Sequence, residues 1–246
     1  IYIHEGGKAA ITGNVSILAK QGGDGFADGI KLYNGGSALT INGNLAMKGT
    51  GSGNDAYGVS AAQKGGYGST KTYQATGINI YDKDGAAFTL NGNLDMKVKG
   101  VGVDMRGSEK NAVTIAGGTI FTPDDGEEAS YKAVAATSGT FAMGMNDAKT
   151  GSNGKDVVVQ GTISLGKKGT VDLGLGSSKS RWTGIADNKD GHPMNLYLSD
   201  GGMWENRRTS KDQYGLFAGS RVTKVAGGTA PAKAGVIVQK DSNPIT

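Results

Sequence analysis

Carboxylate side chains are the groups in this sequence that could do acid and base chemistry. Four of them fall near the ends of neighbouring repeat units: Asp82, Asp84, Asp104 and Glu109. Paired carboxylates at a fixed separation cleave glycosidic bonds by general acid and base catalysis, so a polysaccharide lyase or glycosidase is the enzyme to consider. Aspartates in turns usually accept hydrogen bonds from their own backbone instead. We therefore expect no enzyme activity and no catalytic residue.

Residues that bind metals or cofactors form no recognisable set. His4 and His192 are the only histidines and cysteine is absent, which disfavours a zinc site. An acidic cluster lies in the stretch 122–132 and comprises Asp124, Asp125, Glu127 and Glu128. A calcium site needs oxygens that converge from a fixed backbone, so an acidic surface loop is the favoured interpretation. The sequence has no nucleophile elbow and no phosphate loop, and we predict no metal and no cofactor.

Aromatic side chains indicate binding rather than catalysis. Tyr33 and Tyr81 end equivalent strands of a repeat, so we expect them to face outward in a stacked row that could hold a sugar or a partner surface. Packing against a neighbouring loop is the alternative. The predicted loop 62–76 combines Gly, Ser and Thr with four further candidate ligand-binding residues: Lys64, Tyr67, Lys71 and Tyr73. That composition is typical of a contact surface, although a loop without a ligand would have it too.

The whole chain has a net charge of +4, and the surplus of basic side chains lies in its last quarter. Its candidate polyanion-binding residues are Arg181, Arg207, Arg208 and Lys211. They could bind sulfated glycans, whereas ordinary solvated surface charge is the alternative. We expect no nucleic-acid partner.

A repeat recurs from one end of the sequence to the other. Residues 77–81, a short turn and residues 88–97 match residues 29–33, a turn and residues 39–48 in type and order. Further copies begin at Ile1, Gly102 and Met143. Self-similarity at a period of a few tens of residues is typical of solenoids, propellers and arrays.

Apolar and polar residues alternate within each unit, which predicts short strands with one buried face. Such strands would stack into a parallel β-helix with three interior columns. The first column would be Ile3, Leu32, Ile80, Met105 and Met145; the second Ile11, Ile41, Leu90, Ile115 and Val159; the third Val15, Leu45, Leu94 and Ile163.

The glycine landmarks fit about ten coils and a rod on the order of 45 to 50 Å long. We expect one domain over residues 1–246, with loops inserted near 62–76, 122–132, 146–156 and 176–191. The 44 glycines follow no collagen triplet. No signal peptide or apolar membrane-spanning run is evident and Ile1 lies inside a repeat unit, so we interpret the sequence as part of a longer chain.

Two C-terminal segments carry a resemblance to a known family. Residues 194–204 consist of a strand, a small-residue turn and Trp204, and residues 234–246 follow a Gly-rich stretch. Together with the repeated Leu-x-x-Gly-Asn-Leu-like units, they resemble the passenger region of bacterial autotransporters, the monomeric type V secretion proteins. The resemblance implies a right-handed β-helix secreted through a C-terminal outer-membrane barrel. The serine-protease signature of some passengers is missing here.

The resemblance implies an adhesin segment on the cell surface, at the outer membrane of a Gram-negative-type bacterium. Its partners would be glycans or proteins of host cells or bacteria, and self-association of rods would support biofilm formation and virulence. A structural stalk that binds nothing is the alternative, and a polysaccharide lyase or glycosidase is less favoured.

Overall fold

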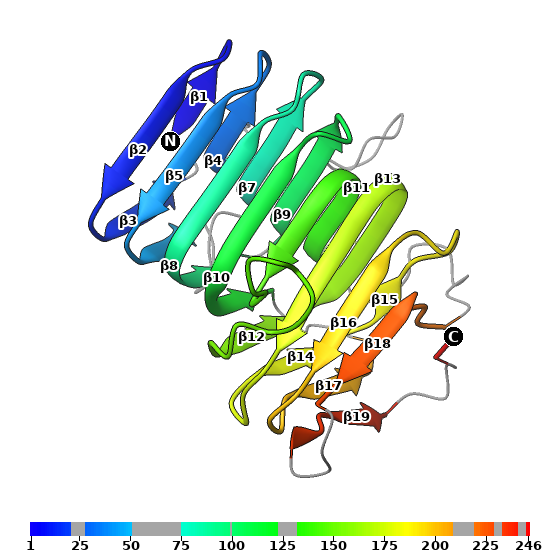
Figure 1. Ribbon diagram of the computed structural model, residues 1–246. Coiled ribbons are helices and arrows are strands. Elements are labelled where there is room, and N and C mark those ends of the chain that lie inside the picture. Colours follow the sequence, from blue (N-terminus) through cyan, green and yellow to red (C-terminus); the bar gives the residue numbers. More distant parts are fainter. Residues whose placement is uncertain are drawn as a thin grey trace.

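A computed structural model of the chain describes residues 1–20, 28–50, 75–98, 100–122, 132–208, 219–228, 233–240 and 245–246. These residues form an all-β solenoid whose strands run side by side from the N-terminal to the C-terminal end (Figure 1). Every pairing between named strands in this part of the chain is parallel. The predicted parallel β-helix is confirmed.

Strand pairing defines three faces of the solenoid. Face 1 consists of β1 (Tyr2–His4), β4 (Asp28–Tyr33), β7 (Ala75–Asp82), β9 (Gly100–Gly107), the first parts of β11 (Lys132–Met143) and β13 (Thr162–Leu175), and β15 (Ala186–Asp187). Face 2 consists of β2 (Lys8–Thr12), β5 (Ala38–Asn42), the first parts of β8 (Ala87–Lys97) and β10 (Ala112–Phe121), the second parts of β11 and β13, β16 (Met194–Leu198) and β18 (Lys224–Gly227). Face 3 consists of β3 (Val15–Lys20), β6 (Leu45–Thr50), the second parts of β8 and β10, β12 (Val157–Gln160), β14 (Arg181–Thr183), β17 (Met203–Asn206) and β19 (Val236–Gln239).

The interior is filled by apolar columns, because alternate residues of each strand point inward. On face 1, Ile3, Leu32, Ile80 and Met105 follow one another in register, as predicted. On face 2, Ile11, Ile41, Leu90 and Ile115 do the same. On face 3, Val15, Leu45 and Leu94 align as predicted. A second inward column on that face runs through Met47, Met96, Ile120 and Val159 to two fully buried, stacked rings, Trp182 and Trp204, whose centroids lie 4.8 Å apart.

Three of the predicted column positions are wrong. The first column continues from Met105 to Ala136, whereas Met145 lies in the segment after β11. Val159 belongs to face 3, where it pairs with Ile120, and Ile163 belongs to face 1, where it pairs with Val134. The cause is the alanine-rich start of β11, whose residues have low β propensity and did not suggest a strand.

The described strands form eight coils, fewer than the expected ten or so, because inserted segments take up residues. Seven steps of about 4.8 Å give a rod roughly 34 Å long over the strands. The predicted loop 146–156 is indeed irregular. The predicted turn 176–191 is wrong, since it contains β14 and β15, and Trp182 packs in the core there. Loops 62–76 and 122–132 lie mostly outside the described residues, and their last residues belong to β7 and β11.

Candidate functional site

The outward side of face 1 carries polar and aromatic side chains in two rows. Strand alternation buries Ile30, Leu32, Ile78 and Ile80 and turns the residues between and beside them outward. One row across the coils is Tyr2, Lys31, Asn79 and Asp104, and the other is His4, Tyr33, Tyr81 and Arg106. Parallel in-register pairing therefore places side chains from four successive coils next to one another.

Stacked rings dominate the N-terminal part of these rows. The Tyr33 and Tyr81 rings have centroids 5.7 Å apart and planes inclined by 17°, and Tyr2 stacks on His4 at 5.1 Å. The Lys31 ammonium lies 5.9 Å from the Tyr2 ring and 5.7 Å from the Tyr33 ring, within cation–π range. Tyr2 and Tyr81 are 58% and 51% exposed, so their rings are open to a ligand. We call Tyr2, His4, Lys31, Tyr33 and Tyr81 the aromatic strip.

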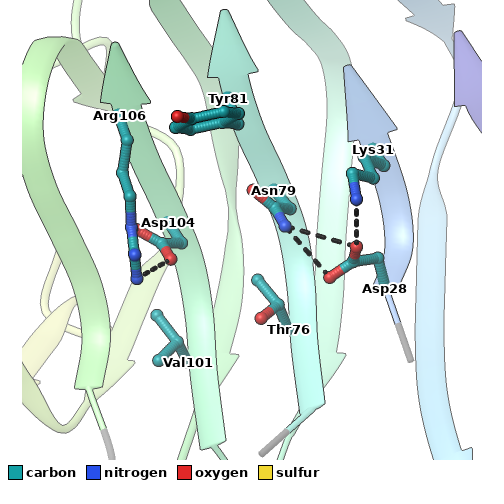
Figure 2. A pocket seen from close by; sticks show the side chains of 8 residues that line it. All are labelled: Asp28, Lys31, Thr76, Asn79, Tyr81, Val101, Asp104 and Arg106. Atoms are coloured by element: carbon teal, nitrogen blue, oxygen red, sulfur yellow. Dashed lines mark hydrogen bonds and ion pairs between the residues drawn. The ribbon is translucent and has the colours of Figure 1, made fainter. Parts of the chain in front are cut away.

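A groove of about 350 Å³ adjoins the strip. It is lined by Asp28, Lys31, Thr76, Asn79, Tyr81, Val101, Asp104 and Arg106 (Figure 2). Volumes of this order suit small ligands or one end of a larger one.

The groove's cations are paired with carboxylates. The Lys31 ammonium lies 3.6 Å from Asp28, and Asn79 Nδ2 donates to both Asp28 oxygens at 3.2 Å. Arg106 binds Asp104 with two hydrogen bonds, from Nε at 3.0 Å and from Nη2 at 2.6 Å. This hydrogen bonding raises the pKa of the Arg106 guanidinium, whereas partial burial lowers it, and the net shift is upward. The groove thus has strong polar groups and no formal excess of charge.

The outward stacking predicted for Tyr33 and Tyr81 is confirmed. Lys64, Tyr67, Lys71 and Tyr73 lie outside the described residues. Sequence reasoning missed Lys31, Asp104 and Arg106 as neighbours of the tyrosines. The sequence could have indicated them, because in each repeat unit these residues occupy outward positions next to an inward apolar residue.

The four carboxylates considered for catalysis are engaged separately. Buried Asp82 accepts hydrogen bonds from the amides of Gly36, Asp84 and Gly85 at the corner between faces 1 and 2. Asp84 accepts one from the Gly35 amide. Asp104 is held by Arg106, and Glu109 pairs with Lys168 at 2.9 Å. These contacts are typical of aspartates in turns and of surface ion pairs.

The basic residues of the last quarter do not form one compact patch. Arg181 faces outward at the start of β14 and is aligned with Met203, whereas Arg207 follows the end of β17, about 13 Å further along the strand direction. Arg207 donates to Glu205 at 3.0 Å. Arg208 is the next residue, and Lys211 lies outside the described residues.

The residues that the structure describes contain no group of three or more His, Asp or Glu side chains placed to hold a metal ion. They also contain no helix with the length and apolar character needed to cross a membrane.

Comparison of the chain with protein-family models, with curated proteins and with solved structures gave no match in any of the three. The likeness to autotransporter passengers therefore stays a prediction from the sequence.

Proposed function

We propose that this chain is a cell-surface adhesin segment that binds neutral glycans through the aromatic strip and the adjoining groove on face 1. The observation that carries the proposal is the stacked pair Tyr33 and Tyr81 beside the ion-paired groove. Exposed ring faces suit the apolar faces of sugar rings, and hydroxyl groups of a sugar can bond to the polar edge formed by Asp28, Asn79 and Asp104.

The charge pattern favours neutral over anionic sugars. Lys31 and Arg106 already contact Asp28 and Asp104, so an incoming sulfate or carboxylate would meet carboxylates as well as cations. The ring positions are fixed by a parallel ladder, so little conformational freedom is lost on binding.

A rod without cysteines suits display outside the cell, and the resemblance to autotransporter passengers suggests the secretion route. The proposed partners are glycans of host cells or of other bacteria, with self-association of rods as a further role. A structural stalk would also be a rod, but its function would not require exposed, stacked aromatic rings, so these rings favour the binding role.

The test is glycan-array binding followed by calorimetry on the best neutral oligosaccharide. Replacement of both rings, Tyr33→Ala with Tyr81→Ala, removes two stacking contacts of about 1 kcal/mol each, so the affinity should fall roughly tenfold to thirtyfold. Leu18→Ala is the matched control, because Leu18 is 58% exposed on face 3, away from the strip. Equal affinity of the double variant and the control, or no glycan binding by the unaltered chain, would contradict the proposal.

A further inference from the structure

A second hollow lies on face 2, next to the segment 144–156 that connects β11 to β12. It has a volume of about 670 Å³ and shares no residue with the groove on face 1. Its polar lining consists of Asn91, Thr114, Asn146, Asp147, Lys149, Asn153 and Lys155. We call this hollow the cleft.

The wall of the cleft is held in place by hydrogen bonds. Asn146 accepts from the Thr150 amide at 2.9 Å, and its own amide donates to the Gly151 carbonyl at 3.0 Å. Asn153 Nδ2 donates to the Ala116 carbonyl on β10 at 2.8 Å, and the Tyr197 hydroxyl donates to the Lys149 carbonyl at 3.1 Å. The segment is therefore fixed to β10 and to β16, and the cleft is formed before a ligand arrives.

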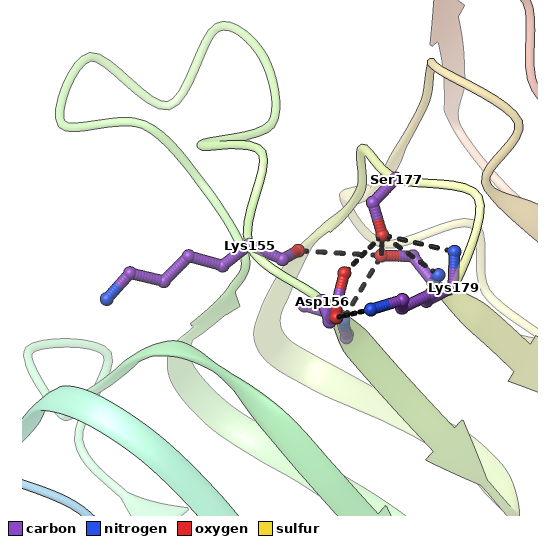
Figure 3. A network of polar contacts seen from close by, with 6 residues as sticks. Lys155, Asp156, Ser177 and Lys179 are labelled. Carbon is purple, nitrogen blue, oxygen red and sulfur yellow. Dashed lines mark hydrogen bonds and ion pairs between the residues drawn. The ribbon is translucent and has the colours of Figure 1, made fainter.

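The cleft is lined by two cations, Lys149 and Lys155, and by one carboxylate, Asp147, so its lining has a formal excess of positive charge. The Lys155 ammonium donates to the Asn91 carbonyl at 3.1 Å and forms no ion pair with any residue that the structure describes. The neighbouring Asp156 side chain points the other way, toward Ser177 at 2.7 Å and Lys179 at 3.9 Å (Figure 3). An ammonium has three donors, so Lys155 can still donate to an anionic group.

We propose that the cleft binds a carboxylate-bearing oligosaccharide, with Lys155 recognising the carboxylate. Amide and hydroxyl side chains such as Asn91, Thr114 and Asn153 both donate and accept hydrogen bonds, which matches sugar hydroxyls. A charge-assisted bond from Lys155 distinguishes acidic from neutral sugars. Asp147 on the same lining would repel an anionic group placed beside it, so the bound carboxylate is expected at Lys155.

This inference does not depend on the proposed function of face 1. The groove there pairs each of its cations with a carboxylate, whereas Lys155 in the cleft has none. The two sites should therefore prefer different sugars and should be separable by mutation.

The test measures binding of trigalacturonate and of its fully methyl-esterified form to the whole chain by calorimetry. The acid should bind about tenfold more tightly than the ester, as expected for one charge-assisted hydrogen bond. Lys155→Met should remove this preference, and Lys155→Arg should keep most of it. Thr114→Val should weaken both ligands, whereas Thr119→Val, on the same strand but facing outward on face 3, should weaken neither.

Lys179→Met is the matched charge control, because Lys179 lies close by but is engaged with Asp156. Equal affinity for acid and ester, no binding of either, or equal losses in Lys155→Met and Lys179→Met would overturn the proposal. Tyr33→Ala with Tyr81→Ala should leave trigalacturonate binding unchanged, which separates failure of this site from failure of the site on face 1.

Discussion

Arg106 keeps its positive charge at every ordinary pH. The hydrogen bond to Asp104 raises the pKa of a guanidinium that is already protonated throughout the ordinary pH range. The stabilisation from a raised folded-state pKa is fully present below the unfolded-state value and is lost only as the pH rises through the folded-state value. Because the pKa of Arg106 is shifted upward, that loss falls only at strongly alkaline pH, outside any working range.

We therefore predict that replacing Asp104, the partner of Arg106, lowers the free energy of unfolding by the same amount at mildly acidic and at mildly basic pH. The Arg106 side chain is 58% exposed, so water screens the pair and Asp104→Asn should lower the free energy of unfolding by about 1 kcal/mol or less. Urea denaturation at about pH 6 and about pH 9 measures this difference. A destabilisation that vanishes at the higher pH would mean that the guanidinium is not the charged partner.

Among the elements, the corner between faces 2 and 3 depends on glycine for close approach between coils. A Cβ on Gly43 would collide with the Gly13 carbonyl, and one on Gly92 with the Gly43 carbonyl. Beside them, the amides of Asn44 and Asn93 each donate at 2.9 Å to the side-chain oxygen of an asparagine one coil earlier. Backbone and side chains thus stack together at the 4.8 Å spacing of the sheet.

We predict that Gly43→Ala destabilises the chain by about 1 to 3 kcal/mol, because the backbone of two coils must move apart. Gly151→Ala is the matched control: its new Cβ would make only an ordinary contact, 3.6 Å from Asn146 Nδ2. The midpoint of thermal or urea unfolding measures both. Equal midpoints for the two variants would show that the corner tolerates a side chain.

Alternation and repeated glycines predict the first four coils well, because units such as residues 29–33 and 77–81 place Leu32 and Ile80 at equivalent inward positions. The prediction fails from β11 onward, since Ala133, Ala135 and Ala136 have low β propensity and their strand was not expected. Later residues were therefore assigned to the wrong face, one face away from their own. Tyr33 and Tyr81 were predictable as equivalent residues. Lys155 was not, because its place in the cleft depends on how the segment 144–156 folds back on β8 and β10.

The solenoid is not built around one central core element, because each coil packs mainly against the coils before and after it. Stability of such a solenoid is approximately a sum of coil terms and neighbour terms, so the first and last described coils should be weaker than the middle ones. Among the residues that the structure describes, β1, β2 and β3 each pair with one neighbouring coil, as do β18 and β19. Val225, Val236 and Ile237 are 48%, 45% and 40% exposed, whereas Val103, Ile163 and Leu173 are fully buried.

We predict that hydrogen exchange along the chain follows this gradient. Peptides that cover β1 to β3 and those that cover β18 and β19 should exchange first, because local opening there breaks one set of ladder hydrogen bonds and exposes little buried surface. Peptides from β8 to β13 should exchange last, since opening them requires separation from coils on both sides. Mass spectrometry of exchange at neutral pH measures the order. Uniform protection from β1 to β19 would mean that the rod unfolds as one cooperative unit. In that case Tyr2 and His4, which the first coil contributes to the aromatic strip on face 1, would be held as rigidly as Tyr81.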